Sequence, residues 1–229
     1  MAMVHVEDRG YQFADGVYEL CEVREGRIID ERRHLDRLWR SLGELQIALP
    51  MTPAALGVVL RETIRRNRVR NGIVYVQITR GVARRDHAFP PSGTPPSLVV
   101  SARSLDLAFN DRLAAEGIAV ITVPDSRWAR VDIKSTALLP NVLAKQAARA
   151  QGAREAWFVD QEGRVTEGAS TNAWIVTQDG KVVTRPADNG ILRGITRTVL
   201  IEAIKAQGLL LEERPFTVTT STPRYPSRT

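Results

Sequence analysis

Alternating and helically spaced apolar residues divide the first third of the chain into a hairpin and two helices. Residues 11–23 combine β-branched and aromatic side chains and run into a turn at 24–26, which predicts a β-hairpin. Asp30 is expected to cap a helix, because apolar residues follow it at helical spacing, namely Leu35, Leu38, Trp39, Leu42 and Leu45. Thr52-Pro53 predicts the start of a second helix, with threonine as the N-cap and proline at the first helical position.

Strands and loops follow up to residue 112. Residues 73–79 alternate apolar and polar side chains, and 97–102 also have a strand-like composition. The intervening residues 81–96 are rich in Pro, Gly and Arg, which predicts a loop. The polar stretch 103–112 is interpreted as a linker, so two domains are expected to meet near residue 108.

The second half is expected to combine short strands, hairpins and two helices. The predicted strands are 118–123 and 128–133, the hairpins are 156–167 and 173–183, and the helices begin at Pro140 and near Thr196 and end at Gly152 and Gly208. The polar tail from Thr217 is expected to be disordered. Helices followed by hairpins, without regular alternation of strand and helix, favour an α+β fold with domains 1–107 and 108–229.

The charge balance and the cysteine content narrow the class of protein. The net charge is +6, but basic residues are interspersed with acidic ones along the chain. The densest basic group is interpreted as the solvent face of the second helix, namely Arg61, Arg65, Arg66, Arg68 and Arg70. Nucleic acid is therefore not an expected partner. Cys21 is the only cysteine, which excludes an intrachain disulfide and a cysteine-based zinc cage.

The N-terminal residues and the hydropathy pattern predict a cytoplasmic protein that does not bind membranes. Charged residues stand where a signal peptide would have an apolar stretch, and no apolar run approaches the length that spans a bilayer. The three histidines, His5, His34 and His87, lie far apart in the sequence and lack metal-ligand spacing, so no metal site is expected.

Lys134 is the best candidate for chemistry in a sequence that lacks phosphate-loop, dinucleotide and serine-elbow motifs. It follows an apolar stretch and precedes a helix, where partial desolvation would lower the pKa of its amine and make it a better nucleophile. The alternative, an exposed lysine at a strand end, remains open at this point. The three other lysines are expected at the surface, namely Lys145, Lys181 and Lys205.

Several motifs in order along the chain carry a family resemblance. Residues 7–19, EDRGYQFADGVYE, closely resemble the opening motif of D-amino acid aminotransferases, which are class IV aminotransferases with pyridoxal phosphate and fold type IV. Further matches follow at similar spacing, namely His34-x-x-Arg37-Leu38, Thr79-Arg80-Gly81 with Arg85-x-His87, Asp132-Ile133-Lys134-Ser135, Val165-Thr166-Glu167-Gly168 and Leu192-Arg193-Gly194-Ile195-Thr196-Arg197. The resemblance extends from about Val4 to Thr217 and implies that the second domain is a pseudo-barrel that binds the cofactor.

The resemblance implies a set of cofactor-binding residues. Lys134 corresponds to the lysine that binds the cofactor covalently and moves the α-proton, and Glu167 to the acid that faces the pyridine nitrogen. The residues implied to bind the phosphate or the ring face are Arg37, Ile195, Thr196 and Leu192. Without the family, Arg37 would equally be a solvated helix residue, and Leu192 an ordinary core residue.

The resemblance also implies how the substrate is bound. Tyr18, Arg85 and His87 correspond to residues that hold the substrate α-carboxylate in D-amino acid enzymes. In the family, the loop that corresponds to 81–96 reaches the neighbouring subunit's active site, which implies a homodimer. The Arg85-x-His87 pair argues against the branched-chain L-amino acid branch of the family. The alternative is that Arg85 and His87 only decorate a polar loop.

We therefore expect a D-amino acid transaminase that moves an amino group from a D-amino acid, such as D-alanine, to a 2-oxo acid, such as 2-oxoglutarate. The alternatives are a branched-chain aminotransferase or an aminodeoxychorismate lyase of the same fold, or a truncated inactive homologue. The chain looks shortened at both ends relative to the family, which usually has a further N-terminal hairpin and a later Ser/Thr-rich loop at the phosphate. Thr219–Thr222 resemble that loop but come too early in the chain.

Overall fold

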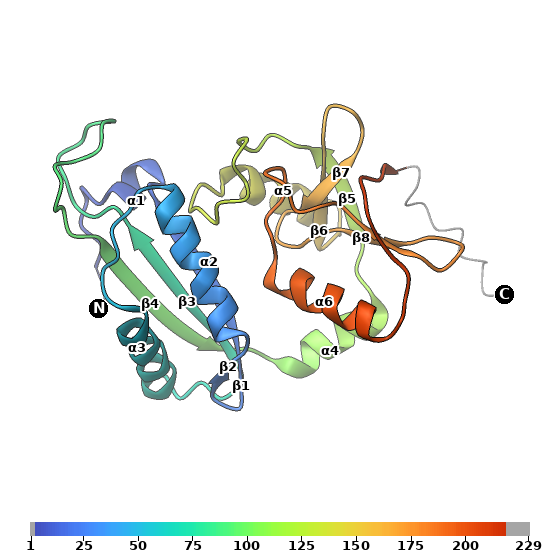
Figure 1. Ribbon diagram of the computed structural model, residues 1–229, viewed down its shortest axis with the longest axis horizontal. Helices are drawn as coiled ribbons and strands as arrows, with labels where there is room; N and C mark the ends of the chain where they lie inside the picture. Colours follow the sequence, from blue (N-terminus) through green and yellow to red (C-terminus); the bar gives the residue numbers. More distant parts are fainter. Residues whose placement is uncertain (1–2, 219–229) are drawn as a thin grey trace. The chain divides into compact units, whose positions relative to one another are not determined.

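The computed structural model describes residues 3–218, which form two compact units. The first unit contains the chain up to Glu116 together with Ile133–Leu138, and the second contains Gly117–Asp132 and the chain from Leu139 onward (Figure 1). The first break between the units therefore follows Glu116, beyond the boundary expected near residue 108. In addition, the segment that carries Lys134 returns to the first unit.

A four-stranded antiparallel sheet organises the first unit. Its strands are β1 (Gly16–Arg24), β2 (Arg27–Ile28), β3 (Gly72–Thr79) and β4 (Ser97–Ser104), in the order β2-β1-β3-β4. Its helices are α1 (Arg9–Phe13), α2 (Glu31–Glu44), α3 (Pro53–Arg66) and α4 (Leu107–Glu116). α3 begins as predicted, because the Thr52 hydroxyl accepts a hydrogen bond from the Ala55 amide and Pro53 occupies the first turn.

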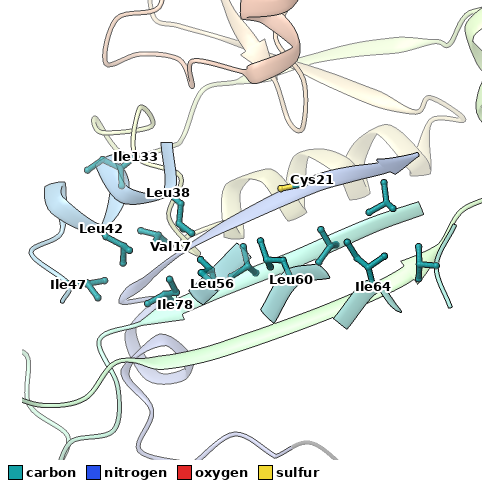
Figure 2. Packing of buried hydrophobic residues seen from close by; sticks show 14 residues of the cluster. Val17, Cys21, Leu38, Leu42, Ile47, Leu56, Leu60, Ile64, Ile78 and Ile133 are labelled. Atoms are coloured by element: carbon teal, nitrogen blue, oxygen red, sulfur yellow. The ribbon is translucent and has the colours of Figure 1, made fainter. Parts of the chain in front are cut away.

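The core of the first unit lies between the sheet and the helices α2 and α3. Its buried apolar residues include Val17, Cys21 and Val23 of β1, Leu38 and Leu42 of α2, Leu56, Leu60 and Ile64 of α3, and Val74, Val76 and Ile78 of β3 (Figure 2). Because successive side chains of a strand point to opposite faces, Glu19 shares the inward face of β1 with Val17 and Cys21. The Glu19 side chain is fully buried, so its charge requires partners.

The segment Ile133–Leu138 lies along the N-terminal half of β1, where β2 leaves the strand edge unpaired. The Tyr18 amide donates to the Lys134 carbonyl at 3.0 Å, and the Thr136 amide donates to the Gly16 carbonyl at 2.9 Å. Ile133 packs into the core of the unit (Figure 2). Backbone pairing and the buried isoleucine together place Lys134 beside Tyr18.

Two three-stranded sheets form the second unit. One is β5 (Val120–Pro124), β6 (Glu155–Val159) and β7 (Val165–Gly168), in the order β5-β6-β7, and the other is β8 (Trp174–Val176), β9 (Val182–Thr184) and β10 (Leu211–Glu213), in the order β10-β9-β8. Along the chain, α5 (Leu139–Ala150) precedes β6, which pairs in parallel with β5. In the same way α6 (Ile195–Ala206) precedes β10, which pairs in parallel with β9. The two predicted hairpins, β6–β7 and β8–β9, are present. The mixture of helices and sheets confirms the predicted α+β class.

Two helices form where the sequence predicted a strand or a linker. Residues 9–13, partly expected as a strand, form α1, because the Asp8 carboxylate caps the helix by accepting from the Gly10 amide at 2.9 Å. Residues 103–112, expected as a linker, finish β4 and enter α4, where the Asp106 carboxylate accepts from the Phe109 amide at 3.2 Å. In both places an aspartate cap initiates a helix that the composition alone did not indicate.

Three further details differ from what the sequence indicated. Residues 128–133 form turns rather than a strand, and the Arg130–Asp132 ion pair at 2.9 Å spans that turn. The strand β10 was not expected, because three residues that pair in parallel with β9 have no local signal. Asp30 precedes α2 as expected, but it adopts a left-handed φ of 50° and its side chain makes no capping bond.

The polar tail predicted to be disordered lies, from residue 219 onward, outside the described residues, and so does the stretch Thr219–Thr222. Within residues 3–218, none of the helices is long and apolar enough to cross a membrane.

Candidate functional site

Lys134 lies next to an aromatic ring in the first unit. Its Nζ is 4.3 Å from the centroid of the Tyr18 ring, a cation–π arrangement. The Tyr18 ring in turn packs against Tyr75 of β3, with 5.6 Å between the ring centroids. Lys134 is half-buried, so the amine has an apolar neighbour on one side, unlike a fully solvated lysine at a strand end.

The buried carboxylate of Glu19 binds Arg37 and His34 of α2. Arg37 donates from Nε to Oε1 at 2.6 Å and from Nη2 to Oε2 at 2.8 Å, and His34 Nδ1 lies 2.7 Å from Oε2. Burial by itself would raise the pKa of Glu19, but these hydrogen bonds and the charges of Arg37 and Lys134 hold the pKa below its usual value. The Arg37 side chain is only 10% exposed, so it is not a solvated helix residue.

Glu167 is the corresponding buried acid of the second unit. It lies on β7, and its carboxylate accepts hydrogen bonds from Arg127 Nη1, from Asn172 Nδ2 at 3.0 Å and from the Leu192 amide at 3.2 Å. Asn172 also donates to the Leu192 carbonyl at 2.9 Å. These contacts fix the orientation of the carboxylate and stabilise its ionised form.

Arg127 connects Glu167 to a second acid. Its guanidinium donates to Asp125 from Nε at 2.9 Å and from Nη2 at 2.8 Å, and it lies 4.4 Å from the centroid of the Phe158 ring. Burial by itself would raise the pKa of Asp125 and lower that of Arg127. The hydrogen bonds and charges outweigh burial, so the pKa of Asp125 is lowered and the pKa of Arg127 is raised. The result is a buried row of charges, acid, base and acid, that ends at Glu167.

The start of α6 presents backbone amides without a side-chain cap. Gly194 is the N-cap and, having no side chain, makes no side-chain capping bond to the first amides, those of Ile195 and Thr196. A Cβ at Gly194 would lie 2.2 Å from the Asn172 side-chain oxygen, so glycine is required for this close approach. Amides at a helix start, with the helix dipole, favour an anion.

Arg85 and His87 lie on the exposed loop 81–96 and are placed against α1. The Arg85 guanidinium carbon is 4.6 Å from the centroid of the Phe13 ring, and the His87 ring centroid is 5.6 Å from it. Both side chains remain exposed. Both side chains of this pair contact the Phe13 ring, whereas the Tyr18 ring contacts Lys134 and Tyr75.

Apart from Ile195 and Thr196, which begin α6, the predicted residues fall into three groups. Lys134, Tyr18 and Arg37 gather around β1, Glu167 and Leu192 share hydrogen bonds in the second unit, and Arg85 and His87 share Phe13. Lys145 lies at the surface as expected, with its side chain 43% exposed, and its Nζ donates to the Arg154 carbonyl at 2.8 Å and lies 3.4 Å from Glu155. Among residues 3–218, no three metal-binding side chains converge on one point.

Sequence reasoning missed three residues that hold the predicted ones. Glu19 had a signal, because a glutamate at an inward position between Val17 and Cys21 indicates a buried ion pair. Asn172 follows Glu167 by five residues, and Arg127 follows β5 by three, but neither spacing identifies a partner. Only the packing of the second unit shows that both side chains meet Glu167.

Comparison with known sequences gives one family. The family described as amino-transferase class IV matches residues 16–220. A D-alanine aminotransferase of Staphylococcus haemolyticus is 42% identical over 218 residues, which are 95% of this chain and 76% of that protein. A D-alanine aminotransferase of Listeria innocua is 40% identical over 218 residues, 95% of this chain and 75% of that protein.

Solved structures have the same fold. A putative 4-amino-4-deoxychorismate lyase from Legionella pneumophila matches with a TM-score of 0.83 at 22% identity, over 96% of this chain and 79% of that chain. At this identity the likeness shows the fold alone. The pyridoxal-phosphate-bound form of a hypothetical aminotransferase from Mycobacterium tuberculosis matches with a TM-score of 0.81 at 25% identity, over 96% of this chain and 78% of that chain.

Proposed function

Because the chain belongs to the class IV aminotransferases, which are pyridoxal-phosphate enzymes, we propose that it is a D-amino acid transaminase. It would move an amino group from a D-amino acid such as D-alanine to a 2-oxo acid such as 2-oxoglutarate. The observation that carries the proposal is the identity of about 40% with D-alanine aminotransferases across 95% of the chain. The presence of Lys134, Glu167, Arg85 and His87 at the positions of the family motifs supports it.

The residues present fit pyridoxal phosphate. The uncapped amides of Ile195 and Thr196 at the start of α6 suit a phosphate dianion. Glu167, buried and held as a carboxylate by Arg127 and Asn172, suits a protonated ring nitrogen. We assign Leu192 to the ring face and Arg37 to the phosphate, with Glu19 holding the Arg37 guanidinium in a fixed orientation.

When bound, the cofactor supplies a carbonyl carbon for amino exchange and a ring that accepts electrons. In the proposed mechanism Lys134 is the residue that would hold the cofactor, and its Nζ would carry the substrate α-proton. The contact of Nζ with the Tyr18 ring limits the positions that the amine can take. Glu167, whose carboxylate accepts hydrogen bonds from three donors, would face the ring nitrogen and favour its protonated form.

Substrate binding is assigned to Tyr18, Arg85 and His87. A guanidinium and an imidazole two residues apart suit a carboxylate, because both donate hydrogen bonds to its oxygens. We propose that the chain forms a homodimer in which the exposed loop 81–96 binds the substrate of the neighbouring subunit. The exposure of Arg85 and His87 supports this assignment, since neither side chain is used in the core of its own unit.

The proposal is tested by the preference for D- or L-amino acid substrates and by the lysine to which the cofactor is bound. With 2-oxoglutarate as acceptor, D-alanine is expected to support turnover and L-leucine is not. Borohydride reduction of the holoenzyme followed by peptide mapping is expected to place the pyridoxyl group on Lys134, one of only four lysines. Lys134→Ala is expected to remove both the turnover and the modification. The matched control is Lys205→Ala, in the last turn of α6, which is expected to keep both.

Three results would overturn the proposal. Equal turnover of L-leucine would indicate a branched-chain enzyme of the same fold. A pyridoxyl group on another lysine, or a purified chain that takes up no cofactor, would remove the catalytic assignment of Lys134.

A further inference from the structure

We propose that Phe13 is a positioning residue for the substrate carboxylate, because it orients Arg85 and His87 on the loop 81–96. The inference rests on the proposed function, since it assigns to Phe13 the arrangement of the two carboxylate-binding side chains. It concerns a residue of α1 that has no polar group and takes no part in the chemistry.

The Phe13 ring is the common neighbour of three cationic or aromatic side chains. Arg85 lies 4.6 Å from its centroid and Arg9 lies 4.9 Å from it, both measured from the guanidinium carbon, and the His87 ring centroid is 5.6 Å away. A guanidinium over an aromatic face is attracted by the ring quadrupole, and a tilted pair of aromatic rings is also favourable. One ring therefore restrains both side chains of the Arg85-x-His87 pair.

The loop backbone is held at the same place by Arg9. This arginine is 3% exposed and donates from Nη1 to the Asp86 carbonyl at 2.7 Å and from Nη2 to the His87 carbonyl at 3.4 Å. Its Nε donates to Asp15 at 2.8 Å. Because the backbone around Asp86 is anchored to α1, the remaining conformational freedom of Arg85 and His87 is mainly in their side chains. The Phe13 ring restricts these side-chain conformations.

Ordinary core packing does not account for Phe13. It belongs to none of the three buried apolar clusters found in residues 3–218, and it is only half-buried. Exposed arginine side chains lose much conformational entropy when they bind a ligand. A ring that already restrains Arg85 reduces this cost, because preorganised groups have less freedom to lose.

The first test compares Phe13→Leu with Phe13→Tyr in the holoenzyme. Leucine keeps the apolar volume but removes the ring, so the KM for D-alanine is expected to rise about three- to tenfold with kcat changed less than about twofold. Tyrosine keeps the ring and is expected to keep the KM. Phe109→Leu, which removes a phenylalanine next to Arg112 on α4, is the matched control and should leave both constants unchanged.

A double-mutant cycle separates failure of this inference from failure of the proposed function. If Phe13 acts through Arg85 and His87, Phe13→Leu adds little to the KM of an Arg85→Ala/His87→Ala variant, because both side chains that it orients are already absent. Full additivity of the two effects would overturn the inference. If Arg85→Ala itself leaves the KM unchanged, the proposed carboxylate site is wrong and the role of Phe13 in binding falls with it.

A third readout needs no activity. The ring current of Phe13 should shift the imidazole proton signals of His87, which can be assigned with His87→Ala because the chain has only three histidines. Phe13→Leu is expected to move the His87 signals toward their free-peptide positions. The signal of His34, held by Glu19 in the core, reports whether the variant is folded. An unmoved His87 signal in a folded Phe13→Leu protein would overturn the inference.

Discussion

Buried carboxylates hold arginine side chains at the residue scale in both units. Glu19 binds Arg37 through two nitrogens, and Glu167 accepts from Arg127, which also binds Asp125. Moving such charges out of water costs several kcal/mol per ion, and their mutual attraction only roughly offsets this cost. We therefore interpret these pairs as interactions that orient the side chains more than they stabilise the fold. Removing one partner, however, leaves an uncompensated charge in the interior.

Glu19→Gln is expected to lower the free energy of unfolding by about 3 kcal/mol at neutral pH, because Arg37 loses its buried counter-charge. The pKa of Glu19 is lowered in the folded state, so its contribution is fully present above its ordinary pKa of 4.5 and is lost as the pH falls through the folded-state value. The difference between the wild type and Glu19→Gln should therefore shrink in acid.

Denaturant titrations at neutral and acid pH measure this difference. Glu22→Gln is the matched control, because Glu22 lies on the same strand and pairs with Arg24 while both side chains are 45% exposed. It is expected to change stability by less than about 1 kcal/mol. A difference between wild type and Glu19→Gln that stays constant at every pH would contradict the assignment of a lowered pKa.

At the scale of elements, helix starts show how local chemistry decides structure. Thr52 caps α3 through its hydroxyl, Asp8 caps α1 through its carboxylate, and Asp30 precedes α2 without making a capping bond. Gly194 leaves the start of α6 uncapped. The start of α6, which like that of α2 lacks a side-chain capping bond, is the one that we assign to the cofactor phosphate, which would supply an acceptor.

Thr52→Ala is expected to lower the free energy of unfolding by about 1 kcal/mol, since the Ala55 amide loses its acceptor. Thr52 is exposed, so no core contact is lost with it. Asp30→Asn serves as the comparison at the start of α2. It is expected to stay within about 0.5 kcal/mol of the wild type, because Asp30 makes no capping bond and asparagine tolerates its left-handed backbone.

Thermal and denaturant unfolding of the two variants decide this prediction. Equal losses for Thr52→Ala and Asp30→Asn would mean that the side-chain cap of α3 contributes nothing beyond a generic substitution at a helix start.

At the scale of the whole molecule, the residues assigned to the reaction come from both compact units. Lys134, Arg37 and the loop 81–96 belong to the first unit, and Glu167 and the start of α6 belong to the second. In the proposed homodimer, the loop 81–96 of each subunit would bind the substrate of the other subunit.

Mixed dimers test this arrangement directly. Lys134→Ala and Arg85→Ala variants are each expected to be impaired, but a hybrid of the two contains one site with both residues intact if the loop acts on the neighbouring subunit. After co-refolding of equal amounts, activity should recover to about a quarter of the wild type, because half of the dimers are hybrids and each has one complete site. A loop that acts within its own subunit leaves every site defective, and the mixture would show no recovery.

Local patterns in the sequence were sufficient for many elements and for the motif residues. The helix α3 was predicted because Thr52-Pro53 combines two strong start signals, and β3 because residues 73–79 alternate. Lys134 and Glu167 were selected as candidates because each lies within a run of consecutive residues that resembles a family motif. Information of this kind lies within a few residues of the position that it describes.

Only the tertiary structure decided which partner each of these residues has. Glu19 meets Arg37, Arg127 meets Glu167, and Phe13 meets Arg85 and His87 across long stretches of sequence. A period of two or 3.6 residues assigns a side chain to a face of its element, but it says nothing about which distant element covers that face. The path of the chain settles that question, and here it returns Ile133–Leu138 to the edge of β1 and thereby places Lys134 against Tyr18.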